Sequence, residues 1–470
     1  MIDVYDLLGH TAFAPTARER SARSLTPSPS RLLTPLTLLV LANAVSLSGN
    51  VITTVAIPWL VLTTTGSATL TGVAVFAGVG GAAVGGLAAG RIVDAIGPIR
   101  TSSAADLLSG LAVAPLPILL ALDALEIWHV VVLAIVGTLA DSAGSTARQS
   151  LVPAAADSGG YTRERANAVF TSAEHTGYLL GAPVAGLLIA AFGVGAALWV
   201  TVGSFAIAAL VVARLVDLPR PSAVAATAGR AGLRETIAFI WGDPALRALL
   251  VFPTVAVLLV GPLAPIVLPV LAREAFGDPV VLGLMVASYG AGGLLGAAGF
   301  GIFGSRIPGR RLFAGVFVVW PATYAAITLV QFLPFTLAML LTLGAAAGSL
   351  VPLMATIRQQ RTPGRLLPRV VGISMASVPV AAPIGVLATG FLIDGLGLHQ
   401  TLLLMTAGAA LIGTTVLMSE GIRALDDPDG PSPVIGPVDD WGPAAARDRN
   451  RPASAAAVIE TTCPVGNSST

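Results

Sequence analysis

A few titratable side chains lie inside long apolar stretches of the chain, where they could carry a proton across a membrane. Glu174 and His175 are neighbours in the stretch 167–192, and Asp141 lies in the stretch 127–147. A charge in the hydrocarbon core costs at least about 2.5 kcal/mol, so ionisable groups there usually serve a function. We expect Glu174 to bind and release the proton, His175 to tune it, and Asp141 to be a further candidate.

Structural roles stay open for the same side chains. Glu174 could be hydrogen-bonded to an adjacent helix or paired with an arginine of the neighbouring loop. A single histidine such as His175 is often a packing residue, and Asp141 lies close enough to the end of its stretch to meet lipid headgroups. Asp106, in the stretch 99–121, and Asp141 are both expected nearer a membrane surface than Glu174.

The composition indicates that these residues are held by membrane-spanning helices. Of 470 residues, 55% are hydrophobic and 11% charged, and the mean hydropathy is +0.84; soluble domains carry about 25% charged residues. Continuous apolar stretches of about 20 residues predict helices rather than the alternating strands of a barrel. The predicted fold is an all-α integral membrane protein with twelve helices, at 35–63, 69–93, 99–121, 127–147, 167–192, 194–215, 245–271, 280–304, 312–331, 334–357, 370–393 and 400–419.

Lysine is absent, since all 26 basic side chains of the lysine and arginine type are arginine. A Walker phosphate loop and a Schiff-base enzyme both need a lysine, so ATP-driven transport by this chain and pyridoxal chemistry are excluded. The single cysteine, Cys463, excludes an intrachain disulfide and a thiolate metal cluster. We expect no enzymatic activity, no cofactor and no metal site.

Arginine placement predicts the topology. One alternating set of loops holds 25 arginines, Arg148 among them, and the other holds only Arg273, which places both termini in the cytoplasm. The first apolar stretch begins too late and is too long for a cleaved signal peptide. The expected organisation is a cytoplasmic segment 1–33, a six-helix bundle 34–215, a cytoplasmic linker 216–244, a second six-helix bundle 245–420 and a disordered cytoplasmic tail 421–470.

Internal repetition supports two halves. Gly90 corresponds to Gly301 and Arg100 to Arg311, each 211 residues apart, whereas the stretch 186–193 corresponds to 390–397 at an offset of 204. We attribute the change of seven to a cytoplasmic loop 148–165 that is longer than the loop 358–369. A parallel repeat about an axis along the membrane normal relates the two halves of major facilitator transporters.

The stretch from Gly90 to Arg100, with Asp94 and Gly97 between them, resembles the signature loop between the second and third helices of major facilitator transporters. Further stretches, 147–153, 165–168, 181–186 and 360–369, resemble the drug:proton antiporter branch that includes macrolide-type and siderophore exporters. The resemblance covers about residues 32–420. It implies that Asp94 and its arginines lock the cytoplasmic face, with the second hinge contributing Arg306, Arg310 and Arg311.

Departures from the family pattern limit the resemblance. Ala95 and Pro98 occupy positions where basic residues are common, and Ser305 stands at the acidic position of the second hinge. The alternative is that Asp94 merely caps a helix and has no role in gating. No basic residue lies between His129 and Arg148, so the fourth helix is expected to lack the inward arginine of many proton antiporters. The antiport-like motif of the fifth helix is Gly177, Gly181, Pro183 and Gly186, although glycines four apart also allow close helix packing alone.

The sequence therefore predicts a secondary transporter of a bacterial cytoplasmic membrane that exports small organic molecules by proton antiport and alternating access. A dedicated siderophore or metabolite exporter is the near alternative, and a non-transporting sensor or partner-binding protein is the distant one. Expected partners are the substrate, protons and the lipid bilayer, with no nucleic acid, and the chain is expected to be a monomer. Candidate substrate contacts are Asn43, Asn50, Tyr178 and Tyr289, and the aromatic ones could equally serve in packing.

Overall fold

The computed structural model describes residues 34–215, 233–330, 332–363 and 366–426, which are helical throughout apart from short turns and contain no strand. The expected segment 1–33 and most of the expected tail lie outside these residues. The first part of the chain forms α2 (Pro35–Thr65), α3 (Ala68–Ile96), α4 (Pro98–Val113), α5 (Pro115–Ala121), α6 (Ile127–Gly159) and α7 (Arg163–Ala213).

The second part of the chain begins with α8, in the last residues of the expected linker. Its elements are α8 (Leu233–Gly242), α9 (Pro244–Val260), η2 (Leu263–Val267), α10 (Leu268–Leu271), η3 (Ala272–Phe276), α11 (Pro279–Phe303), η4 (Gly304–Arg306), α12 (Gly309–Leu329), α13 (Leu333–Arg361), α14 (Leu367–Leu396), α15 (Leu398–Met418), α16 (Glu420–Arg423) and η5 (Ala424–Asp426). The first residues of the expected tail form α16 and η5, and α16 packs against α9.

Ten helices among the described residues are long and apolar enough to cross a membrane. Large apolar side chains such as Leu87, Leu111 and Leu411 are exposed on the outside of the helices. Exposed apolar surface on this scale requires a partner such as lipid, and helices satisfy their own backbone hydrogen bonds there. The prediction of an all-helical integral membrane fold is confirmed.

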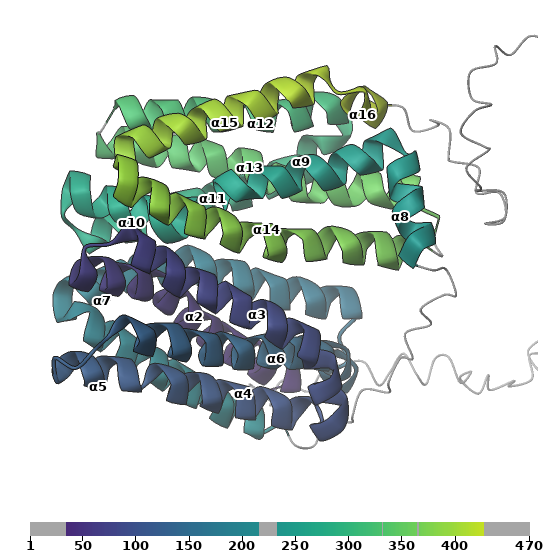
Figure 1. Cartoon of the computed structure of the whole chain (residues 1–470). Helices are drawn as coiled ribbons and strands as arrows, with labels where there is room; N and C mark the ends of the chain where they lie inside the picture. Colours follow the sequence, from purple (N-terminus) through teal and green to yellow (C-terminus); the bar gives the residue numbers. More distant parts are fainter. Residues whose placement is uncertain (1–33, 216–232, 331, 364–365, 427–470) are drawn as a thin grey trace, which may run out of the picture.

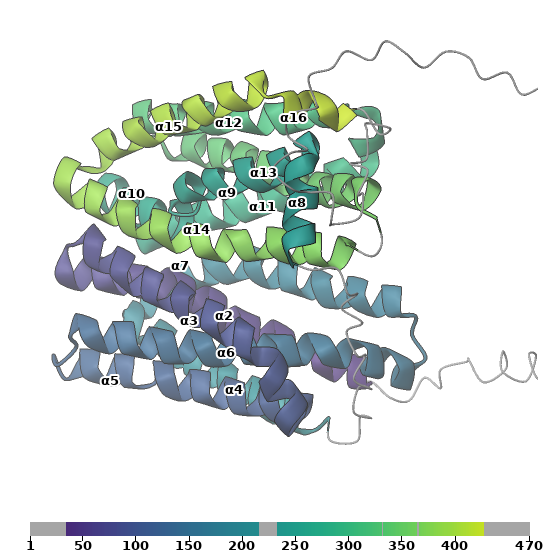
Figure 2. The ribbon, with the colours of Figure 1, turned by 45° about the vertical axis from the view of Figure 1, so that its right-hand side comes forward.

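The helices form two groups that lie side by side, α2 to α7 in one and α9 to α15 in the other (Figures 1 and 2). Within them α2 packs on α7, α3 on α6, α11 on α13 and α12 on α15. The helices run along a common direction, and we name the two ends of the molecule by residues in their turns. The Thr34 end also contains Gly97, Gly160 and α8, and the Gly66 end also contains α5, Gly193 and α10.

Two glycine corners share one backbone conformation. Gly193 bends α7 with φ 81° and ψ 165°, and Gly397 joins α14 to α15 with φ 84° and ψ 161°. This region of backbone space is essentially open only to glycine. The two residues are 204 apart, so the repeat read from the sequence has a structural counterpart at these corners.

Two seams join the groups, α7 with α11 and α3 with α14, and each is built on a reciprocal pair of glycines. A Cβ on Gly186 would lie 2.6 Å from the Pro279 carbonyl oxygen, and one on Gly283 would lie 2.6 Å from that of Ala182. At the other seam the corresponding pair is Gly72 and Gly390, whose Cβ atoms would lie 3.3 Å from Val386 O and 2.7 Å from Ala68 O. The pairs correspond at offsets of 211 and 204, so the two seams are equivalent under the repeat.

Two charged side chains of the second group bind helix ends of the first at the Gly66 end. Asp394, in the last turn of α14, accepts hydrogen bonds from Ser67 Oγ (2.6 Å) and from the backbone N–H groups of Ala68 (2.8 Å) and Thr69 (2.9 Å), where α3 begins. Arg273 donates to the carbonyl of Leu62 in the last turn of α2. An anion at a helix N-terminus and a cation at a helix C-terminus are both stabilised by the helix dipole.

The explanation offered for the change of offset is wrong. Residues 148–159 continue α6 as helix and do not form a loop, and the connection to α7 is short. The equivalent helix, α13, ends at Arg361, directly after Gln360. The additional residues of the first half therefore lengthen a helix, and Arg148 lies inside this helix instead of in a loop.

Candidate functional site

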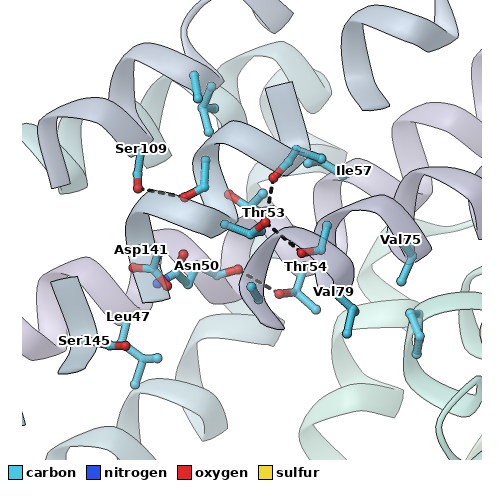
Figure 3. Close-up of a pocket in the computed structure, with 18 of the residues that line it drawn as sticks. Leu47, Asn50, Thr53, Thr54, Ile57, Val75, Val79, Ser109, Asp141 and Ser145 are labelled. Atoms are coloured by element: carbon cyan, nitrogen blue, oxygen red, sulfur yellow. Dashed lines mark hydrogen bonds between the residues drawn. The ribbon is translucent and has the colours of Figure 1, made fainter. Parts of the chain in front are cut away.

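A cavity of about 690 Å³ opens between α2, α3, α4 and α6, and residues of α5, α7, η2 and α14, with Gly261 after α9, complete its wall. Most of the lining is apolar. The charged lining residues Asp141, Arg148 and Glu174 lie close together around Asn43, and Asn50 also lines the cavity. Figure 3 shows this cavity with Asn50 and Thr54 of α2, Ser109 of α4 and Asp141 of α6 among the side chains around it.

Arg148 is the centre of a buried polar cluster. Its side chain is 2% exposed. Nη1 donates to both carboxylate oxygens of Asp106, at 2.9 and 3.0 Å, and Nε donates to Asn43 Oδ1 at 3.0 Å. Ser46 Oγ donates to Asp106 Oδ1 at 2.8 Å. A buried ion pair is tolerated when hydrogen bonds satisfy its remaining groups, as they do here.

Two further carboxylates lie at the edge of this cluster. Asp141 Oδ1 is 3.7 Å from Arg148 Nη2, beyond hydrogen-bond distance, and has no hydrogen-bond partner among the described residues. Glu174 Oε1 accepts from Asn43 Nδ2 at 3.3 Å, so Asn43 links it to the arginine. One guanidinium therefore serves three acids, and the surplus negative charge can be removed by protons or by a cationic ligand.

Helical spacing places these side chains together. Asn43 and Ser46 are three residues apart on α2, Ser102 and Asp106 four apart on α4, so each pair shares a helix face. Asp141 and Arg148 are seven apart on α6, two turns along the same face. The cluster thus depends on three helices meeting, and Glu174 of α7 adds a fourth.

The cluster corrects two expectations from the sequence. Arg148 is not a loop residue, and the helix that carries it does have an inward arginine. Asp106, which binds Arg148, is completely buried between the helices. The signal lay in residues 151–156, a second apolar run after Arg148 whose Leu151, Val152, Ala155 and Ala156 are buried. Their helical spacing shows that the helix continues past Arg148.

The hinge residues lie at the Thr34 end. Gly90 and Asp94 belong to the last turns of α3, Gly97 forms the corner with φ 87°, and Asp94, Arg100, Arg306, Arg310 and Arg311 are exposed. Asp94 has no hydrogen-bond or ion-pair partner among the described residues. The structure therefore brings the hinge residues of the first half to one corner but leaves their acid without a contact.

The glycine motif of α7 makes helix contacts. A Cβ on Gly177 would lie 3.1 Å from Leu47, and one on Gly181 would lie 2.8 Å from Val51, both on α2, whereas Gly186 and Pro183 meet α11 at the seam. Asn43 and Asn50 line the cavity with the charge cluster, and Tyr289 lines a second cavity of about 570 Å³. The side chains of His175 and Tyr178 lie outside the described residues.

The sequence matches the Major Facilitator Superfamily over residues 39–266 and 255–455. The multidrug efflux pump Tap of Mycolicibacterium fortuitum is 34% identical over 398 residues, covering 83% of this chain and 97% of that protein. The pump of the same name from Mycobacterium tuberculosis is 29% identical over 401 residues, covering 83% of this chain and 95% of that protein.

Solved structures share the fold. A mutant of the nucleoside transporter NupG superposes with a TM-score of 0.70 at 10% identity, covering 82% of this chain and 99% of that one. A bacterial homologue of the human lysosomal transporter Spinster, inward-facing and unoccupied, gives 0.64 at 14% identity, covering 83% and 97%. With the match along the sequence, this arrangement of apolar helices around a buried charge cluster shows that the chain is a multi-pass membrane protein belonging to the Major Facilitator Superfamily.

Proposed function

We propose that the protein exports small, lipophilic organic molecules from the cell in exchange for protons. The observation that carries the proposal is the cluster of Arg148 with Asp106 and Asp141 at the wall of a cavity of about 690 Å³. The relatives called multidrug efflux pump Tap support the same activity. A cavity that is mainly apolar, with a few charged groups on one side, suits lipophilic molecules that carry a positive charge.

We further propose twelve membrane spans with the Thr34 end in the cytoplasm. The bend at Gly193 divides α7 into two spans, and α14 provides another beyond the ten found by length and composition. The arginine-rich turns lie at the Thr34 end, as the positive-inside rule requires. On this topology the bundles 34–215 and 245–420 are the two moving bodies, and one chain suffices for transport.

The proton and the substrate compete for the acids beside Arg148. Asp141 lines the cavity and its side chain is 23% exposed, while its Oδ1, which is buried, has no hydrogen-bond partner among the described residues. Glu174 is the second exchangeable group, because Asn43 connects it to Arg148. A cationic substrate displaces the proton from this pair, and a new proton expels the substrate. Asp106 is held by the side chains of Ser46 and Arg148 and keeps Arg148 in position.

Alternating access requires contacts that exist in one state only. At the Gly66 end Asp394 and Arg273 bind helix ends of the opposite group, and the glycine seams bring the backbones together. At the Thr34 end Asp94 is exposed. This combination corresponds to an inward-facing state, with the outer side closed. The contacts of Asp394 and Arg273 must break when the outer side opens, and Asp94 then takes a partner at the inner side.

The test is transport by purified protein in liposomes with an imposed pH gradient, using ethidium as a cationic substrate. A proton moving down 100 mV supplies about 2.3 kcal/mol, enough for a detectable gradient of ethidium. Asp141→Asn and Glu174→Gln should each lower proton-driven uptake at least about tenfold, while Glu420→Gln, an exposed acid outside the cavity, should match the parent. Absence of proton-linked flux in the parent would favour the non-transporting sensor, and unchanged coupling in both acid variants would refute the assigned roles.

A further inference from the structure

The second cavity, of about 570 Å³, differs in chemistry from the cavity beside Arg148. It lies between α2 and α7 on one side and α11 and α13 on the other, and its lining carries no charged side chain. Thr54 and Tyr289 are the two lining residues with a polar side-chain group. Thr54 also lines the first cavity, so the two spaces share part of the wall formed by α2.

The two polar groups of the second cavity differ in whether their hydroxyl proton is already used in a hydrogen bond. Thr54 Oγ1 donates to the Asn50 carbonyl at 2.8 Å, so its proton is already used inside α2. The Tyr289 hydroxyl has no hydrogen-bond partner among the described residues. A phenol that borders an apolar space and has a free proton can donate one hydrogen bond to an acceptor on a bound molecule.

Glycines create the space without loosening the helices. A Cβ on Gly344 would lie 2.0 Å from Tyr289 O and one on Gly292 2.1 Å from Leu341 O, so α11 and α13 are in backbone contact. Gly290 lies on the same helix as Tyr289 and lines the cavity, and a Cβ added there would meet no atom within 4 Å. The cavity is thus an empty volume beside two tightly packed helices of the same group, which makes it a preformed site.

We propose that this cavity is a second binding compartment, which takes uncharged apolar molecules with a hydrogen-bond acceptor, and that Tyr289 donates the bond that orients them. The inference rests on the proposed export function and extends its substrate range. Because the two cavities are lined by different residues apart from Thr54, a cation in one and a neutral molecule in the other can bind at the same time.

Binding of two radiolabelled probes to the purified full chain tests the proposal. Progesterone is uncharged, apolar and has carbonyl acceptors, and tetraphenylphosphonium is a lipophilic cation. In the parent, saturating tetraphenylphosphonium should leave progesterone binding within about twofold of its value alone. Gly290→Leu should lower progesterone affinity at least tenfold and leave the cation unaffected. Tyr289→Phe should lower progesterone affinity by roughly twofold to tenfold, the value of one hydrogen bond.

Gly299→Leu is the matched control, since Gly299 lies on the same helix, does not line the cavity, and has open space around an added Cβ. Leucine favours helix more than glycine, so neither variant should weaken α11. Competitive displacement of progesterone by tetraphenylphosphonium would overturn the proposal, as would equal effects of the two leucine variants. A third outcome would also overturn it: the parent does not bind progesterone, and it co-purifies with phospholipid that the Gly290→Leu variant lacks. The occupant of the cavity would then be an acyl chain. Intact binding without proton-linked flux would refute the export function alone.

Discussion

The two ends of the molecule use an aspartate in opposite ways. At the Thr34 end Asp94, which the sequence singles out, is exposed and has no partner among the described residues. At the Gly66 end Asp394, which nothing in the sequence marked, binds the start of α3 through three hydrogen bonds. The engaged acid lies in the last turn of its own helix, where the dipole disfavours it, so its stabilising contact is with the opposite group. The difference identifies which end is closed.

The largest effect on stability is expected for a change in the charge cluster, away from both ends. It tests whether the cluster is needed for folding, separately from the gating contacts at the ends. Arg148→Leu leaves Asp106 buried without its cation and should lower the free energy of unfolding by about 3 to 5 kcal/mol, seen as a fall in the thermal unfolding temperature in detergent. Arg148→Leu combined with Asp106→Leu should recover most of the loss. If the single variant unfolds like the parent, the cluster does not stabilise the interior. The cluster would then have to be counted with Asp94 and Asp394 as a group that acts in gating.

The next effect concerns the closed end. Asp394→Asn combined with Arg273→Gln removes two charged contacts, each worth about 1.5 to 3 kcal/mol, and should shift the population toward an open Gly66 end by at least about 100-fold. Spin labels on cysteines at 124 and 400, both exposed near this end, report the separation by pulsed electron resonance in a Cys463→Ser background. Asp278→Asn, which removes an acid that caps α11 within its own group, is the control. An unchanged distance distribution would mean that the glycine seams alone close this end.

The smallest effect is expected at the open end. Because Asp94 is exposed, Asp94→Asn should change the unfolding temperature little, by the equivalent of less than about 0.5 kcal/mol. In the background of the Asp394 and Arg273 changes, however, Asp94→Asn should reduce the outward-open fraction, since the inner side then loses its contact. The same labels measure both cases. A large loss of stability from Asp94→Asn alone would contradict the inward-facing reading of the structure.

Much of the fold could be predicted because the hydrocarbon core of a membrane requires long apolar stretches in the sequence. Long apolar stretches must be helices in lipid, and the offsets of 211 and 204 identify equivalent glycines such as Gly72 with Gly283. The seams confirm this equivalence through contacts that hydropathy does not describe. Repetition therefore predicted more of the structure than any single motif.

The charge cluster was missed because the sequence rules treat arginine as a marker of helix ends. Arg148 follows an apolar stretch, so the positive-inside rule assigns it to a loop. Its actual position depends on Asp106 and Asn43, more than 40 and 100 residues away in the chain, and such long-range pairing leaves no local pattern. Glu174 was found because it interrupts an apolar stretch, but its link to Arg148 through Asn43 required the packing of α2.

The turn between α2 and α3 brings the end of one helix and the start of the next within a few residues, at Leu62 and Ala68. Arg273 and Asp394 bind backbone groups on these two helix ends, apart from the hydroxyl of Ser67. Almost any residue at 62, 68 or 69 would offer the same backbone carbonyl or N–H. The side chains at these positions can therefore change without a matching change at Arg273 or Asp394, and correlated substitutions would not reveal this contact. Turn length is what matters: one residue inserted beside Gly66 would displace both helix ends from their ionic partners while leaving every interacting residue in the chain.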